Sequence, residues 1–297
     1  MAHLSAAYHT PLILLLLVLT CYTCTSKSYG LVDVMKNENK RIVECDIGFD
    51  YSEGSGKGPE DWGKLYPEWA SCSYGRTQSP IDLATQMPIP VYGSLGLQYY
   101  KPYPAVLQNK CHDIAIAWNG PTWDGRAGGI LLDNKCYQLS GCHWHSPSEH
   151  TFDGHRSPLE LHMVHKSSDN QRIVVVGVTY EIGEPDIVLE RLMEYIKSLG
   201  LDKCVGVGEL NPRAVLFGQF LEYRPAYYRY NGSLTTPPCT ENVDWIVLKK
   251  KKSVSWQQLV ALREAVGCGY QSNARPTQPI NDRPVWFYGP FRSAISY

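Results

Sequence analysis

The chain has 297 residues, a hydrophobic share of 43% and a formal net charge of −1 at pH 7. This length allows one large or two small domains, and the apolar content suits a soluble globular protein with a substantial core. A net charge so close to zero gives no electrostatic reason to expect a nucleic acid or an anionic membrane as a partner.

The N-terminal segment has the pattern of a secretory signal peptide. The apolar run Pro11 to Thr20 is flanked by small polar residues and is shorter than the roughly 20 apolar residues of a membrane-spanning helix. We therefore predict a cleaved signal at about residues 1–27 and entry into the secretory pathway. No Lys or Arg precedes the run, so an uncleaved anchor is the alternative, although no stable membrane anchor is expected.

The remaining chain divides by composition into three parts. Residues 28–44 are polar and of mixed charge, as in a linker, residues 45–290 form the predicted domain, and residues 291–297 form a tail. Of the ten cysteines, Cys21 and Cys24 lie in the leader, which leaves eight. An even number in an exported chain predicts disulfides, but eight cysteines allow about 105 pairings, so their spacing does not give the connectivity.

Short apolar segments bounded by turn residues predict a strand-rich domain. The predicted strands are His112–Trp118, Cys136–Ser146, Leu159–Lys166, Arg172–Glu181 and Val243–Lys250. Apolar residues at helical spacing predict helices over Asp186–Leu199 and Ser255–Val266, and the second begins with a capping serine. Since strands and helices do not alternate, we expect a mainly β single domain with a central, mostly antiparallel twisted sheet flanked by short helices.

A histidine pattern in two of these strands indicates a metal site. His143 and His145 lie two residues apart, so in a strand both imidazoles point to one face. The next strand brings a third histidine, and phase alone does not separate His162 from His165 or from His150 in the connection. Three neutral imidazoles leave one position of a tetrahedral zinc open to water, which is the catalytic arrangement.

Six separate motifs in the matching order resemble the alpha-type carbonic anhydrases, especially the plant form. They are Gly58–Trp62 (GPEDW), Gln78–Asp82 (QSPID), Cys142–Thr151 (CHWHSPSEHT), Glu160–His165 (ELHMVH), Gly232–Cys239 (GSLTTPPC) and Asn273–Pro279 (NARPTQP). The resemblance implies a zinc-dependent carbonate dehydratase, a lyase that reversibly hydrates carbon dioxide to bicarbonate and a proton. It also implies a single domain with the zinc at the bottom of a conical cleft.

The resemblance implies a specific set of ligands and supporting residues. His143, His145 and His162 match the zinc ligands, whereas His165 matches a structural histidine. Glu160 matches the acceptor of a hydrogen bond from His162, which fixes the ligand's tautomer, and Asn273 matches a backbone partner of another ligand.

Further residues match those that orient the zinc hydroxide and carry away the released proton. Thr235 resembles the threonine that accepts a hydrogen bond from the zinc hydroxide and donates one to a carboxylate, a position that Glu149 matches. Because an ionised carboxylate only accepts, this relay orients the nucleophile. His112 matches the proton shuttle, a role that needs a group titrating near neutral pH.

Substrate contacts also follow from the resemblance. An apolar wall suits carbon dioxide, which offers no hydrogen-bonding handle, and Thr236 matches a contact to bicarbonate. The residues that match the wall are Val164, Val175, Leu234, Val243 and Trp245. Sulfonamides and anions are the implied inhibitors.

Two positions depart from the family pattern. Gly141 replaces a glutamine two residues before the first ligand, so His143 lacks that hydrogen-bond partner, and such losses weaken metal binding roughly ten- to a hundred-fold. Cys111 replaces a glycine before the shuttle, which implies a changed or strained backbone. We expect reduced rather than absent activity, and a disulfide between Cys111 and Cys142 is a further hypothesis.

The resemblance also bears on the disulfide framework and the destination. Cys72 and Cys239 match the paired cysteines of exported relatives, and this bridge would hold the Thr235 turn. The expected destination is the extracellular space or apoplast, and a plastid reached through the secretory route is the alternative. Two alternative functions are considered. One is a storage or binding protein that kept only the fold, but such proteins typically lack a zinc histidine and this chain has all three. The other is a zinc hydrolase that acts on esters.

Overall fold

The computed structural model describes residues 47–83, 88–92, 95–99, 101–118, 127–218, 225–267 and 269–289. They belong to one compact unit, Ile42–Tyr297. The predicted signal, linker and tail lie outside the described residues. None of the helices described is both long and apolar enough to cross a membrane.

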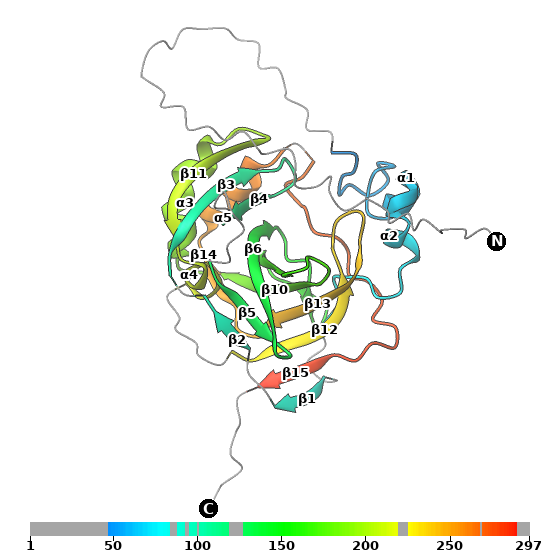
Figure 1. Ribbon diagram of the computed structural model, residues 1–297. Helices are drawn as coiled ribbons and strands as arrows, with labels where there is room; N and C mark the ends of the chain where they lie inside the picture. The colour runs from blue at the N-terminus through cyan, green and yellow to red at the C-terminus, as the bar shows by residue number, and fades with distance from the viewer. Residues whose placement is uncertain are drawn as a thin grey trace, which may run out of the picture. The chain divides into compact units, whose positions relative to one another are not determined.

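Strands dominate the described chain (Figure 1). They are β1 Ile89–Tyr92, β2 Gly96–Gln98, β3 Tyr103–Asn109, β4 Ile114–Ala117, β5 Gly129–Leu132, β6 Lys135–His145, β7 Thr151–Phe152, β8 His155–Arg156, β9 Leu159–Ser167, β10 Ile173–Ile182, β11 Lys203–Leu210, β12 Tyr227–Ser233, β13 Glu241–Leu248, β14 Lys252–Val254 and β15 Trp286–Gly289. The helices are α1 Trp62–Leu65, the 3-10 turn η2 Pro67–Trp69, α2 Ser71–Tyr74, α3 Ile187–Ser198, α4 Pro212–Phe217 and α5 Trp256–Ala265. Each of the five predicted strands and both predicted helices is present.

A single sheet of 13 described strands carries the fold, with the main order β1-β15-β12-β13-β10-β9-β6-β4-β3-β11. Most neighbours pair antiparallel, but β1 with β15, β10 with β13, and β10 with β14 pair parallel. The sheet is therefore mixed, and the expected mostly antiparallel description is correct only in part. Parallel neighbours cannot be joined by a hairpin, and in each of these three pairs a long stretch of chain separates the two strands.

The two long helices begin at the residues that cap them. The carboxylate of Asp186 accepts hydrogen bonds from the N–H groups of Val188 and Leu189, and Ser255 forms a capping box with Gln258. These side chains satisfy donors that the first helical turn leaves unpaired. Figure 1 shows α3, α4 and α5 gathered near β11 and β14, whereas α1 and α2 lie on the other side.

Alternation along the central strands separates two faces of the sheet. Leu161 and Met163 of β9 belong to the large core cluster, which also contains Leu189 and Leu192 of α3. Val175 and Trp245 belong to a second cluster on the opposite face. Because successive strand residues face opposite ways, the even-numbered residues of β9 project toward the second cluster. This opposite face holds the candidate site.

Candidate active site

Three imidazoles meet on the face of the sheet opposite the large core. His143 and His145 project from β6, and His162 projects from β9 directly across from His143 in the antiparallel register. Their ligating nitrogens lie within 4.8 Å of one another, and the ring centroids are 4.7–5.3 Å apart. His145 and His162 are buried, while His143 is partly exposed.

The hydrogen bonds of two rings leave one nitrogen of each facing the cluster. His145 Nδ1 donates to the carbonyl of Asn273 at 2.7 Å, and its Nε2 is buried with no hydrogen-bond partner among the described residues. His162 Nε2 donates to Glu160 Oε1 at 2.9 Å, so Nδ1 is its remaining ligand atom. Burial lowers the pKa of His143 and of His162, which favours the neutral form that binds metal. The donor set fits zinc.

The other two candidate histidines have their ring nitrogens engaged elsewhere. His150, with Glu160 and His162, forms a second group close enough for a metal, but its Nδ1 bonds Glu160 at 2.7 Å and its Nε2 bonds the hydroxyl of Tyr230 at 2.8 Å. His165 lies on the core face, with Nε2 at 2.7 Å from the hydroxyl of Tyr99. The geometry therefore favours His162 as the third imidazole.

Glu160 is the central acceptor behind the cluster. Its Oε2 accepts from the N–H groups of Glu149 and His150 at 2.8 and 2.9 Å, and its Oε1 faces the rings of His150 and His162. Burial raises the pKa of Glu160, but the two histidines outweigh it and hold the pKa well below its ordinary value. An ionised Glu160 fixes the tautomers of both rings.

Asn273 ties the ligand strand to the segment that carries His112. Its side-chain oxygen accepts from the Ser146 N–H at 2.8 Å, and its amide nitrogen donates to the His112 carbonyl at 2.6 Å. Together with the bond from His145 to its own carbonyl, these contacts fix the ring of His145. The carbonyl of Asn273 is therefore a hydrogen-bond partner of His145, and its role behind a zinc ligand stays a prediction.

Glu149 is fully buried beside the cluster. Its Oε1 accepts from the backbone N–H of Arg275 at 2.9 Å. Its Oε2 lies 3.6 Å from His145 Nε2 and 3.8 Å from His162 Nδ1 and has no hydrogen-bond partner in the described chain. Thr235 is buried in the turn after β12, but across the described residues no hydrogen bond joins it to Glu149. The relay between these two residues stays a prediction.

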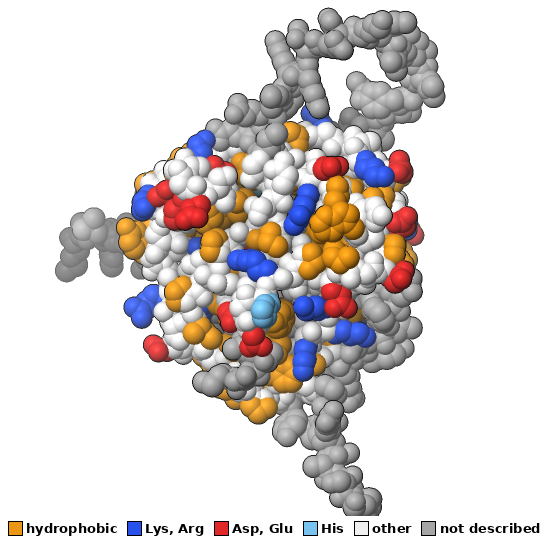
Figure 2. All heavy atoms as spheres, turned by 180° about the vertical axis from the view of Figure 1, so that it is seen from behind, with side chains coloured by type: hydrophobic (Ala, Val, Ile, Leu, Met, Phe, Trp, Pro, Cys, Tyr) orange, Lys and Arg blue, Asp and Glu red, His pale blue; other side chains and the backbone are white. Residues whose placement is uncertain are grey.

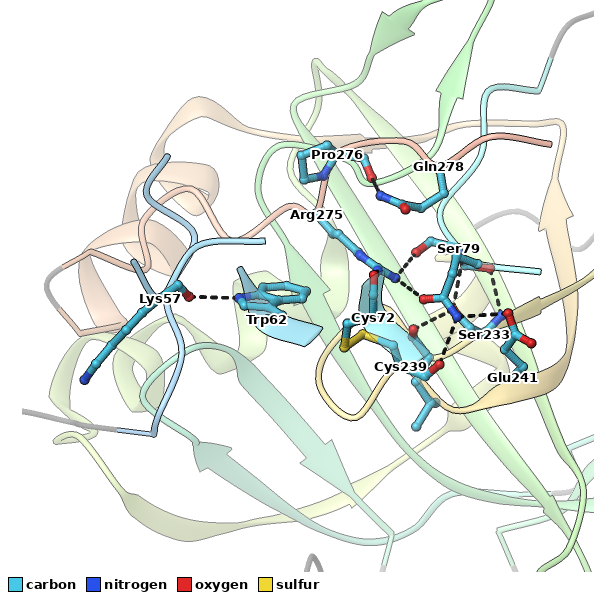
Figure 3. Close-up of a disulfide and its surroundings, with 12 residues drawn as sticks. Lys57, Trp62, Cys72, Ser79, Ser233, Cys239, Glu241, Arg275, Pro276 and Gln278 are labelled. Atoms are coloured by element: carbon cyan, nitrogen blue, oxygen red, sulfur yellow. Dashed lines mark hydrogen bonds between the residues drawn. A yellow bond between two sulfur atoms is a disulfide. The ribbon is translucent and has the colours of Figure 1, made fainter. Parts of the chain in front are cut away.

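Arg275, whose backbone N–H donates to Glu149, is itself held beside the Cys72–Cys239 disulfide; Figure 3 shows Arg275 and the disulfide. Cys72 and Cys239 are bonded, as expected, so α2 is joined to the turn that contains Thr235. The Arg275 guanidinium donates to the carbonyls of Cys72 and Ser79 at 2.9 and 2.8 Å. Arg275 lies in a matched motif, but no sequence signal marked its role, because Cys72 and Ser79 lie 203 and 196 residues away in the chain.

The residues expected to form the substrate wall lie together. Val175, Val243 and Trp245 are buried in the second apolar cluster, and Val164 and Leu234 pack against it. The Trp245 ring lies 4.8 Å from the ring of His162. Thr236, in the same turn as Leu234, is partly exposed. An apolar surface therefore adjoins the imidazole cluster.

The departure at Gly141 has the expected consequence and a steric cause. Among the described residues, no hydrogen bond reaches the imidazole of His143. Gly141 lies at a bulge in the pairing of β6 with β9, and a Cβ atom there would stand 2.7 Å from the carbonyl oxygen of Ile116. The close approach of β4 therefore excludes a side chain at this position.

The hypothesis of a Cys111–Cys142 disulfide is wrong. Cys142 is a buried thiol on the core face, while Cys111 is disulfide-bonded to a partner outside the described residues. The two side chains cannot pair because strand alternation directs Cys142 away from the site. The φ of Cys111 is 71°, in the left-handed region that favours glycine. The cysteine side chain therefore strains the backbone at this position.

His112 lies in the turn between β3 and β4. Its side chain is 19% exposed, and its ring packs edge-on against Phe49 with the centroids 5.7 Å apart. Burial lowers the pKa of His112, and the Asp113 carboxylate opposes that effect. The ring is accessible to solvent and close to a buried charge.

The comparisons with known proteins agree with this geometry. The family model for eukaryotic-type carbonic anhydrase matches residues 57–289. The chain belongs to the eukaryotic-type carbonic anhydrases. Alpha carbonic anhydrase 4 of Arabidopsis thaliana is 44% identical over 84% of this chain and 88% of its own length. The resemblance inferred from the motifs is thus confirmed, and the chain is an enzyme, a carbonate dehydratase.

Two solved structures extend the comparison. A crystal structure of dioscorin complexed with ascorbate has a TM-score of 0.76 and 37% identity, covering 82% of this chain and 99% of dioscorin. The alpha-carbonic anhydrase from Thermovibrio ammonificans, in complex with the inhibitor sulfanilamide, has a TM-score of 0.70 and 32% identity, covering 80% and 98%. Both support a carbonic anhydrase fold for this chain.

Proposed function

We propose that this carbonic anhydrase hydrates carbon dioxide reversibly at a zinc ion held by His143, His145 and His162. The observation that carries the proposal is the convergence of three imidazole nitrogens within 4.8 Å. His145 Nε2 is buried without a hydrogen bond, and burial keeps His143 and His162 neutral. When bound, zinc at three imidazoles supplies an activated water molecule as nucleophile.

The protein's own residues prepare the site for that chemistry. Glu160 and Asn273 fix the orientation of His162 and His145 through hydrogen bonds of 2.9 and 2.7 Å. The Oε2 of Glu149 has no hydrogen-bond partner in the described chain and lies beside the cluster. There it can accept a hydrogen bond from the Thr235 hydroxyl, whose lone pairs then orient the nucleophile. The wall that includes Val164, Val175 and Trp245 excludes water and receives the apolar substrate.

His112 completes the proposal as the proton shuttle. Hydration releases one proton per turnover, and a partly exposed histidine in the β3–β4 turn can pass it to solvent bases. The missing partner of His143 leads us to expect zinc affinity roughly ten- to a hundred-fold below that of relatives that retain the glutamine.

We also propose that the chain acts in the secretory pathway. The Cys72–Cys239 disulfide supports this, since such bonds persist in oxidising compartments. Aromatic sulfonamides and small anions are the proposed inhibitors. The structurally similar alpha-carbonic anhydrase from Thermovibrio ammonificans was solved in complex with the inhibitor sulfanilamide.

One protein fold can carry different functions, so catalysis needs a test beyond the architecture. The deciding test is a carbon dioxide hydration assay of the oxidised protein as purified, after zinc removal, after zinc is restored, and with an aromatic sulfonamide. We expect activity that is lost with the zinc, returns with it and is inhibited by the sulfonamide. His162→Ala should be inactive, whereas His155→Ala, at an exposed position, should match wild type. A protein that holds zinc but never hydrates carbon dioxide would refute the proposal.

A further inference from the structure

A buried carboxylate next to His112 has no role in the mechanism above. Asp113 is 4% exposed and immediately precedes β4. Its Oδ2 lies 3.4 Å from His112 Nε2. Its Oδ1 is buried with no hydrogen-bond partner among the described residues, and the nearest cation is Lys110 Nζ at 4.0 Å. Burying a carboxylate is costly unless it interacts with positive charge, so this placement needs a physical reason.

The contacts of His112 define which nitrogen accepts a proton. His112 Nδ1 lies 2.9 Å from the carbonyl oxygen of Lys110, and a carbonyl only accepts, so Nδ1 carries a hydrogen. The lone pair of the neutral ring is therefore on Nε2, which faces the Asp113 carboxylate. Two acceptors that face each other at 3.4 Å repel, whereas a protonated Nε2 and the carboxylate attract. The local geometry thus favours the imidazolium.

The remaining surroundings of His112 oppose that charge. Burial lowers the pKa of His112, and the charges of Lys110 and His145 lower it further. The Asp113 carboxylate and the hydrogen bond to the Lys110 carbonyl raise it. The rings of Phe49 and Tyr270 pack against the imidazole and add no charge to offset its burial. Among the described residues, Asp113 is the only carboxylate with a leading effect on the pKa of His112.

Asp113 stays ionised in this environment. Burial raises the pKa of Asp113, but Lys110 and the neighbouring histidines outweigh burial and hold the pKa well below its ordinary value. A fixed negative charge therefore stands beside His112 throughout the neutral pH range. Such a charge can tune a proton acceptor toward the pH at which the enzyme works.

We propose that Asp113 is a positioning residue for proton transfer: it holds His112 with Nε2 as the accepting atom and stabilises the imidazolium. In each hydration turnover, the released proton adds to His112 Nε2 and then leaves for a base in solution, while Asp113 remains a carboxylate. This inference rests on the proposed function, because it gives His112 the shuttle role.

The test uses the full zinc-loaded protein and Asp113→Asn, which preserves shape and removes the charge. Because an opposite charge at this distance shifts a pKa by about 1 to 3, kcat in dilute buffer at pH 7 should fall roughly three- to tenfold. The ratio kcat/KM and the zinc content should not change. Millimolar imidazole should restore kcat, and the double variant with His112→Ala should lose no more than His112→Ala alone. Asp282→Asn, at an exposed site, is the matched control.

Nuclear magnetic resonance provides a readout that does not depend on catalysis. The pKa of His112 should fall in Asp113→Asn and rise in Lys110→Gln, which removes an opposing positive charge. An unchanged His112 pKa in both variants, or a loss of kcat that imidazole cannot restore, would overturn the inference. If the wild-type protein neither binds zinc nor hydrates carbon dioxide, the proposed function fails, and the titration still decides whether Asp113 stabilises the imidazolium.

Discussion

At the scale of single residues, burial and one hydrogen bond decide what each histidine can do. His162 and His165 lie three positions apart in β9 and are both buried, yet one nitrogen of His162 faces the cluster while His165 bonds Tyr99 on the core face. Strand alternation accounts for this separation. The shared face of His143 and His145 was predictable for the same reason.

The buried ring of His165 should make folding sensitive to acid. Burial lowers its pKa from 6.5 to about 4, so the folded chain resists a proton that the unfolded chain binds. The contribution of His165 to the free energy of unfolding is therefore fully present above pH 6.5. It is lost as the pH falls toward 4, and the loss amounts to about 3 kcal/mol. In metal-free protein, urea unfolding of His165→Asn should show a shallower pH dependence than wild type, by about that amount.

The exposed His155 provides the control for this titration. His155→Asn should unfold with the same pH dependence as wild type. Parallel curves for His165→Asn and wild type between pH 6.5 and 4 would show that His165 titrates normally in the folded protein. The sequence could not predict this behaviour, because the partner of His165 in β9 is Tyr99, which lies 66 residues earlier in the chain.

At the scale of elements, the central strands and the two long helices were predictable from local pattern. Short apolar segments bounded by turn residues mark β6, β9, β10 and β13, and the caps Asp186 and Ser255 mark the starts of α3 and α5. In contrast, apart from β4, the other strands of the sheet were not predicted, and β11 is one of them. It contains glycines and a register shift between Gly206 and Glu209, so its sequence lacks the regular alternation of a buried strand.

The bulge at Gly141 should not tolerate a side chain. A Cβ there would meet the Ile116 carbonyl at 2.7 Å, so β4 or β6 would have to move. Gly141→Ala should reduce the free energy of unfolding by about 1–3 kcal/mol, the usual cost of overpacking. Urea denaturation measures the loss. Gly206→Ala, whose Cβ would meet no atom within 4 Å, should change stability little. Equal effects of the two substitutions would contradict the steric explanation.

At the scale of the whole molecule, contacts between distant segments assemble the site. The β10–β13 pairing places Val175 beside Trp245, and Arg275 reaches back to Cys72 and Ser79. Local sequence does not determine such pairings, which is why the resemblance to a family, rather than periodicity, gave the ligand set. Charges of both signs are interspersed on the face seen in Figure 2, in keeping with the near-zero net charge.

The Cys72–Cys239 disulfide should matter for both stability and activity. It spans a sequence separation of 167 residues and fixes the turn that carries Thr235. Replacing both cysteines by serine should reduce the free energy of unfolding by about 2–5 kcal/mol. It should also reduce kcat/KM, because the Arg275 contacts that support Glu149 include the Cys72 carbonyl. Cys136→Ser, at an exposed thiol, is the control, and a double variant as stable as this control would contradict the prediction.

The central claim is that His143, His145 and His162 hold one zinc ion with a position left for solvent. Zinc K-edge X-ray absorption of the purified, oxidised protein tests it most directly, together with zinc stoichiometry. We predict one zinc per chain with three imidazole nitrogens and one oxygen at about 2.0–2.1 Å. His150→Asn should leave the number of imidazole ligands unchanged, whereas each cluster variant should lose the ion. A thiolate in the zinc shell, or purified protein without stoichiometric zinc, would contradict the claim.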